Sequence, residues 1–250
     1  MAKAKMAVQT EAMGDVEETR EKQTHSGFIA KAMLGKHEPL PFPKQPESDR
    51  QLADAWLDRF ANFLKTNVNP NKIDAEGDMP DEVLDGFRKL GAFGIKIPKE
   101  YGGLGFSQSN YCRAAMLFGG WCGNTSALLS AHNSLGATLP IMKYATEEQK
   151  QRWLPRIAKG TITAFALTEK GVGSDTSRMQ AYAQRIRDEN GKVIEYRLNA
   201  EKIYTTNAVR RDNTALADLV VVVARTVDHP EEVETVRRGK MPSSSLFHAP

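Results

Sequence analysis

The chain has 250 residues, of which 34 are basic and 31 acidic, giving a formal net charge of +3. Such a balance gives no electrostatic reason to expect a nucleic-acid partner. The longest purely apolar run, Leu219 to Ala224, is far too short to cross a bilayer as a helix. Hydrophobic residues make up 40% of the chain, enough for the core of one large or two small domains.

The N-terminal part of the chain lacks the pattern of a packed domain. Residues 1–27 carry five acidic and four basic side chains and no apolar run, which argues against a secretory signal or a transit peptide. Four prolines follow within residues 37–49. We therefore expect a disordered or extended arm over residues 1–47. The two cysteines fit a reducing compartment, and we expect a cytoplasmic location, or the mitochondrial matrix in a eukaryote.

Helical periodicity dominates the next part of the chain. Apolar side chains recur at three- and four-residue steps, as on one face of an α-helix. This pattern predicts a bundle of about five helices, over residues 48–67, 80–90, 107–118, 126–142 and 146–160. Ser107 is the expected N-cap of the third helix. Ser48 with Gln51, and Thr146 with Gln149, have the spacing of capping boxes.

After Gly160 the period changes from about 3.6 to 2. Strands are expected within residues 163–169, 179–186, 193–199 and 217–225, with a hairpin turn at Asn190-Gly191. Residues 227–245 are expected to form a loop. The predicted fold class is therefore α+β, with a helical domain over residues 48–160 and an antiparallel, β-barrel-like domain over residues 161–250.

The segment "GVGSDT", residues 171–176, contains two glycines two positions apart. It does not match the dinucleotide-binding fingerprint, because its sixth residue is Thr176 and no helical pattern follows at once. It lacks the Gly-Lys-Ser of a phosphate-binding loop as well. Taken alone, two glycines between strands are most often a turn.

Five segments together carry a more specific signal. They are "LGAFGIKIPKEYGGLGFS" (90–107), "SAHNSLG" (130–136), "EEQKQRWLP" (147–155), "TEKGVGSD" (168–175) and "LNAEKIYTTN" (198–207). With these motifs at this spacing, residues 48–226 resemble the acyl-CoA dehydrogenase family. The Phe-Pro-rich lead-in and the segment around His132 look most like its long-chain and very-long-chain branch.

This resemblance implies that the chain binds FAD. Thr168 would hydrogen-bond the pyrimidine side of the flavin, Tyr204 would lie beside the ring, and Thr206 would place its hydroxyl near the flavin N5 atom. Ser174 would contact the pantetheine or phosphate part of the substrate. We call the full set of implied cofactor-binding residues the flavin wall: Phe165, Ala166, Leu167, Thr168, Gly173, Ser174, Tyr204, Thr205 and Thr206.

The family reaction is the α,β-dehydrogenation of an acyl-CoA thioester, with electrons passing to an electron-transfer flavoprotein. In the family, a further helical bundle carries the carboxylate that removes the α-proton, completes the FAD site and builds the oligomer. No residue here takes the place of that base, and no metal-ligand spacing is present. We therefore expect the N-terminal and middle domains of such an enzyme, inactive by themselves, with a homo-oligomer for the full-length protein.

Several positions depart from the family pattern or have simpler interpretations. Lys170 stands where the family commonly has Pro, and Ala200 and Ala208 where it commonly has Gly. Considered singly, Tyr204, Thr205 and Thr206 fit ordinary strand residues, Glu169 fits a solvated turn, and His132 fits a hydrogen-bonded helix histidine.

Three other functions stay open from the sequence. The first is an acyl-CoA oxidase or a related flavoprotein, which the oxygen reactivity of the reduced flavin would identify. The second is a non-catalytic short subunit that assembles with a partner chain carrying the helical bundle. The third is a truncated product without independent activity.

Overall fold

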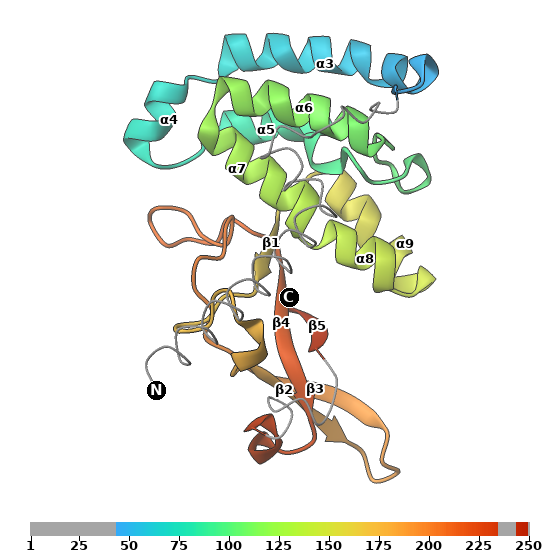
Figure 1. The fold of residues 1–250 in the computed structure, drawn as a ribbon, viewed down its shortest axis with the longest axis vertical. Helices are drawn as coiled ribbons and strands as arrows, with labels where there is room; N and C mark the ends of the chain where they lie inside the picture. Colours follow the sequence, from blue (N-terminus) through green and yellow to red (C-terminus); the bar gives the residue numbers. More distant parts are fainter. Residues whose placement is uncertain (1–43, 235–243, 250) are drawn as a thin grey trace, which may run out of the picture. The chain divides into compact units, whose positions relative to one another are not determined.

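The computed structural model describes residues 44–234 and 244–249, and those of them from Gln45 onward belong to one compact unit, whose fold is drawn in Figure 1. Nearly all of the arm expected over residues 1–47 lies outside the described residues. No helix in the described ranges is long and apolar enough to cross a membrane.

The predicted helical half is confirmed. Its α-helices are α3 (Glu47–Asn67), α4 (Pro70–Glu76), α5 (Asp81–Lys89), α6 (Gln108–Trp121), α7 (Gly123–Ser130), α8 (Thr138–Tyr144) and α9 (Glu147–Ala158). Figure 1 shows α3 alongside α6, and both are lined by buried aromatic side chains. The rings of Trp56 and Phe60 stack with centroids 4.7 Å apart, and Phe60 meets Phe87 of α5 at 5.6 Å. These large rings explain why the helices pack as one bundle.

The helix starts test the capping predictions. Ser107 accepts a hydrogen bond from the backbone N of Asn110, and Thr146 forms a reciprocal capping box with Gln149, so both predictions are confirmed. The box predicted at Ser48 is wrong. The extended Pro46 is the N-cap there, so α3 begins one residue earlier, and no side chain caps it.

The single helix expected over residues 126–142 is divided in three. A π-helical turn, η3 (Ala131–Leu135), separates α7 from α8. The backbone N of Gly136 bonds to the carbonyl of Ala131, five residues back, at 2.7 Å. This wider turn contains the fully buried His132, whose ring bonds to the carbonyl of Phe93 and to Thr163. The interpretation of His132 as a hydrogen-bonded helix histidine is therefore confirmed.

The second half contains a five-stranded sheet. Its strands are β1 (Thr163–Ala166), β2 (Tyr182–Arg187), β3 (Val193–Asn199), β4 (Leu219–Val227) and β5 (Ser244–Ala249). The α+β class is confirmed, but the expectation of a purely antiparallel sheet is wrong. β4 pairs in parallel with β1 and with β2, whereas β2–β3 and β4–β5 are antiparallel. As described, the sheet is open rather than a closed barrel.

Strand order follows from the connections. A long segment joins β3 to β4 and carries β4 past β2, so that β4 pairs with β2 on the side away from β3, whereas a tight hairpin would have placed β4 directly beside β3. The loop expected over residues 227–245 is also corrected in part, because β4 extends to Val227 and β5 begins at Ser244. Residues 235–243 lie outside the described ranges.

The hairpin predicted at Asn190-Gly191 joins β2 to β3. Only Gly191 has a positive φ, of 78°, so the turn is not the two-residue type that needs a positive φ at both central positions. Instead the carboxylate of Asp188 accepts hydrogen bonds from the backbone N atoms of Asn190 and Lys192, at 3.0 and 2.9 Å. The hairpin is confirmed, with a longer turn than the sequence predicted.

Candidate functional site

The glycine-containing loop begins with a tight turn directly after β1. Glu169 and Val172 form an isolated antiparallel bridge, with backbone hydrogen bonds of 3.2 and 2.9 Å. Gly171 lies between them with a φ of 79°, in the left-handed region that glycine tolerates best. Lys170 does not need a positive φ. The backbone thus accepts Lys170 where the family commonly has proline.

The second motif runs beside this turn. The backbone N of Ile203 donates to the carbonyl of Thr168 at 2.9 Å, which places the next residue, Tyr204, beside the end of residues 165–168. Tyr204 has a φ of 55° and an 88% exposed side chain. Residues 204–206 lie outside any strand, so the interpretation of Tyr204, Thr205 and Thr206 as ordinary strand residues is wrong.

Asn207 anchors the end of this motif. Its φ is 70°, and its side-chain amide donates to the carbonyls of Leu128 in α7, at 3.0 Å, and Thr163 in β1, at 3.4 Å. Thr206 lines a pocket of about 220 Å³ together with Leu128 and Leu216. A hydroxyl-bearing segment is therefore held where the helices meet the sheet.

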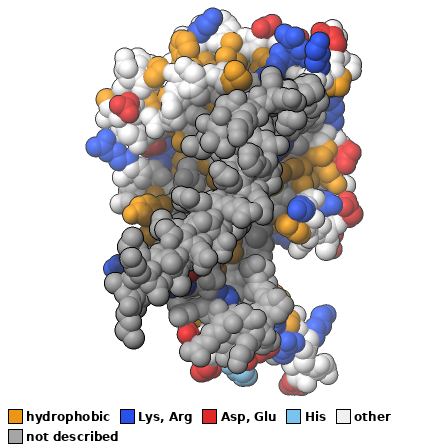
Figure 2. Space-filling view, in the orientation of Figure 1, with side chains coloured by type: hydrophobic (Ala, Val, Ile, Leu, Met, Phe, Trp, Pro, Cys, Tyr) orange, Lys and Arg blue, Asp and Glu red, His pale blue; other side chains and the backbone are white. Residues whose placement is uncertain are grey.

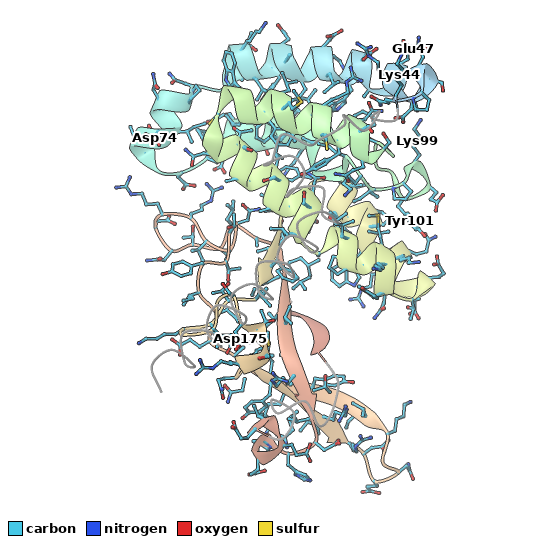
Figure 3. All side chains as sticks on the ribbon, viewed as in Figure 1. Lys44, Glu47, Asp74, Lys99, Tyr101 and Asp175 are labelled. Atoms are coloured by element: carbon cyan, nitrogen blue, oxygen red, sulfur yellow. The ribbon has the colours of Figure 1, made fainter. Side chains whose placement is uncertain are left out.

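The residues of the flavin wall lie at different depths. Ala166 is buried in β1 and Phe165 is partly buried. The more exposed side chains of the flavin wall all come after β1 in the chain. Leu167, Thr168 and Thr205 are partly exposed, whereas Gly173, Ser174, Tyr204 and Thr206 are exposed. Figure 3 locates the glycine loop by its label on Asp175, the residue after Ser174. The structure thus brings Thr168 and residues 204–206 together through the backbone, with Ser174 on the loop that follows.

Glu169 is the residue that sequence reasoning misjudged. Instead of a solvated turn residue it is buried, and its carboxylate accepts bonds from Lys202 Nζ at 2.7 Å and from the backbone N atoms of Gln180 and Ala181, at 2.6 and 2.9 Å. Burial opposes ionisation, but these hydrogen bonds prevail and lower the pKa of Glu169. A clue was available in the sequence, because one motif carries the acidic Glu169 and the other carries the basic Lys202.

A loop that follows the second motif explains why alanine is tolerated at position 208, where the family commonly has glycine. Ala208 lacks a positive φ, and its carbonyl accepts from the backbone N of Leu216 at 3.0 Å, closing residues 208–216 into a small excursion. Arg210 in this excursion bonds to Asp81 at 2.5 Å and lies 3.6 Å from Asp78. The excursion is therefore attached to the helices, and glycine is not needed at position 208.

Charges are interspersed over the face of the described residues that Figure 2 shows, without a large area of one sign. Within the described ranges, no group of three or more His, Cys, Asp or Glu side chains could hold a metal ion. The chemistry of the site consists of hydroxyls, backbone groups and one exposed ring.

Known proteins resemble most of this chain. The family model "Acyl-CoA dehydrogenase, N-terminal domain" matches residues 51–161, which is the helical half described above. A probable acyl-CoA dehydrogenase, FadE10 of Mycobacterium tuberculosis, is 40% identical over 229 residues, covering 90% of this chain and 34% of that protein. The chain belongs to the acyl-CoA dehydrogenase family.

Further family members extend the match. The mitochondrial very long-chain specific acyl-CoA dehydrogenase of mouse is 36% identical over 189 residues, covering 75% of this chain and 27% of that protein. The crystal structure of an acyl-CoA dehydrogenase from Bacillus anthracis, complexed with FAD, superposes with a TM-score of 0.59 at 28% identity, covering 82% of this chain and 31% of that one. The chain thus spans about a third of the length of the curated relatives it matches.

Proposed function

We propose that this chain supplies the N-terminal helical domain, residues 48–160, and the middle domain, residues 161–250, of a FAD-dependent acyl-CoA dehydrogenase. The observation that carries the proposal is the hydrogen bond from Ile203 to Thr168, because it sets the two family motifs side by side. The match of residues 51–161 to the family's N-terminal domain supports the same assignment.

The surface beside that hydrogen bond fits a planar cofactor. Tyr204 presents an 88% exposed ring, and Thr168 and Thr206 present hydroxyls. A Cβ added at Gly171 or Gly173 would meet nothing within 4 Å, so the loop leaves space in front of it. An aromatic side chain beside hydrogen-bonding groups is a chemically suitable surface for a flavin ring.

When bound, FAD would accept the hydride that the thioester loses. Thr168 would donate to the pyrimidine side of the ring, and Thr206 would hold its hydroxyl near N5. Such fixed donors stabilise the negative charge that a reduced flavin gains. Ser174, exposed on the glycine loop, would contact the polar part of the thioester.

The proposed substrate is an acyl-CoA thioester of fatty-acid oxidation. The proposed electron acceptor is an electron-transfer flavoprotein, and the proposed assembly of the complete enzyme is a homo-oligomer. The named very-long-chain relative supports a long acyl chain. A cytoplasmic location, or the mitochondrial matrix in a eukaryote, is proposed on the same family basis, and fractionation of the source cells would test it.

Flavin titration tests the function directly. FAD is added to the purified chain and its fluorescence quenching is followed. We expect weak, saturable binding that is weakened further in Thr168→Val and Thr206→Val. The control is Thr66→Val, since Thr66 lies on α3 and its hydroxyl bonds to Asn62. Equal affinity in the control and both site variants would contradict the proposed site.

A further inference from the structure

The buried ion pair between Glu169 and Lys202 adjoins the flavin wall, since Glu169 directly follows Thr168 and Lys202 lies two residues before Tyr204. The two side chains are 6% and 7% exposed, and Lys202 Nζ lies 2.7 Å from Glu169 Oε1. Lys202 also donates to the carbonyl of Leu167 at 3.1 Å. One ammonium group thus contacts the residue before Thr168 and the residue after it.

The carboxylate extends these contacts in the other direction. Its two oxygens accept the backbone N atoms of Gln180 and Ala181, just before β2. The pair therefore fastens the end of β1, the approach to β2 and the "EKIYTTN" segment at one point. The hydrogen bond from Ile203 to Thr168 lies immediately beside this point in the chain.

Stability alone is a weak explanation for a buried ion pair. Replacing such a pair by apolar side chains of similar volume is often neutral or stabilising, because both charges lose their hydration. What the pair adds here is directional: Lys202 binds the carbonyl of Leu167, and Glu169 binds the backbone N atoms of Gln180 and Ala181.

We propose that Glu169 and Lys202 are positioning residues, which set the spacing between Thr168 and the Tyr204–Thr206 segment and thereby the affinity for flavin. The role toward flavin rests on the proposed function. The role toward the backbone is a property of this chain and is measurable without any ligand.

The first experiment measures amide hydrogen exchange of the purified chain by NMR. In Lys202→Met, the amide of Ile203 should exchange about tenfold faster, as expected when a buried hydrogen-bonded contact is lost, while amides of β4 keep their protection. Lys150→Met is the matched control, because it removes the surface ion pair to Glu147 on α9. Unchanged exchange at Ile203 in the folded Lys202→Met chain would overturn the positioning role.

The second experiment separates positioning from stability with the double variant Glu169→Gln/Lys202→Met. Removing both charges should restore much of the stability that either single change loses. Flavin affinity should nevertheless stay reduced, about tenfold, because the bond to the Leu167 carbonyl is lost and glutamine offers one acceptor oxygen in place of the two that bind Gln180 and Ala181. A folded double variant with the FAD affinity of the unsubstituted chain would overturn the proposal.

The two readouts separate the two claims. If the unsubstituted chain fails to quench FAD at all, the proposed flavin site is contradicted, and the exchange of Ile203 still decides whether the pair positions the backbone. If FAD binds, but the exchange of Ile203 in Lys202→Met matches that in Lys150→Met and the double variant keeps the FAD affinity of the unsubstituted chain, the flavin site stands and the inference falls.

Discussion

The Nδ1 atom of His132, in the π-helical turn, accepts a hydrogen bond from the backbone N of Thr163 in β1 over 3.1 Å. The Nε2 atom of the same ring lies 2.8 Å from the carbonyl of Phe93. A neutral ring with its proton on Nε2 satisfies both contacts, whereas a protonated ring would direct an N–H at the N–H of Thr163. The ring therefore accepts the N–H of Thr163 only while it is uncharged, although the Thr163 hydroxyl also lies 3.0 Å from Nδ1.

This relationship predicts a pH-dependent stability. Burial lowers the pKa of His132 from 6.5 to about 4. Below pH 6.5 the unfolded chain takes up a proton that the folded chain refuses, so this group's contribution falls as the pH drops from about 6.5 to 4. The difference of 2.5 pKa units corresponds to about 3 kcal/mol. Urea unfolding at pH 7 and pH 4.5 measures it.

His132→Gln should flatten that pH profile, because the group that titrates is gone. The matched control is His229→Gln, since His229 is exposed and should leave the profile unchanged. Identical profiles for His132→Gln and the unsubstituted chain would contradict the assignment.

Gly136→Ala should destabilise the chain. A Cβ at this position would lie 2.2 Å from Thr163 Oγ1 and 2.7 Å from the carbonyl of His132. We expect a loss of about 1–3 kcal/mol in the free energy of unfolding, as for other overpacked sites. The control is Gly120→Ala in α6, where the added Cβ meets nothing within 4 Å and should stabilise by about 0.5–1 kcal/mol. Equal effects of the two changes would refute the steric argument.

Variants of Asn207 separate backbone conformation from hydrogen bonding. Asn207→Gly accepts the φ of 70° but loses the bonds to Leu128 and Thr163, which should cost about 1–3 kcal/mol for the orphaned carbonyls. Asn207→Ala should cost about 1 kcal/mol more, because alanine resists that φ. Chemical denaturation measures both. A glycine variant as stable as the unsubstituted chain would show that the amide contributes nothing.

The chain alone should not turn over acyl-CoA. We expect none of its described carboxylates to act as the family's base, and general acid–base groups typically contribute roughly 10²–10⁴-fold. A flavin exposed on one side would also have weaker hydrogen bonds, since these act in a high dielectric. The assay adds a long-chain acyl-CoA and a dye acceptor to the chain with excess FAD. Bleaching that depends on the thioester would show that a base lies within these residues.

Local signals predicted most of the helical half. The caps at Ser107 and Thr146 depend on neighbours three residues away, so their sequence pattern was sufficient. The π-helical turn at His132 was not predictable in this way, because its partners Phe93 and Thr163 are 39 and 31 residues distant.

The same limit applied to the sheet and the site. Alternation predicted the strands, but the parallel pairing of β1 with β4 joins residues such as Thr163 and Leu219, whose relative direction no local pattern encodes. Glu169 seemed solvated because it follows a strand and precedes a glycine turn. Its burial depends on Lys202, which only the folded chain brings close.

The central place of β4 has a consequence for how the chain folds during synthesis. β1 and β2 each hydrogen-bond to β4 and not to one another in the described sheet, and β5 pairs with β4 as well. When residues up to about 210 have left the ribosome, the helical bundle is therefore complete, but β1 and β2 still lack β4, the strand with which both of them pair. Closing β1 onto β4 requires a long loop, which slows assembly relative to the local helices. During that interval the edges of β1 and β2 that pair with β4 in the folded chain are exposed, and unpaired strand edges of this kind are prone to aggregation.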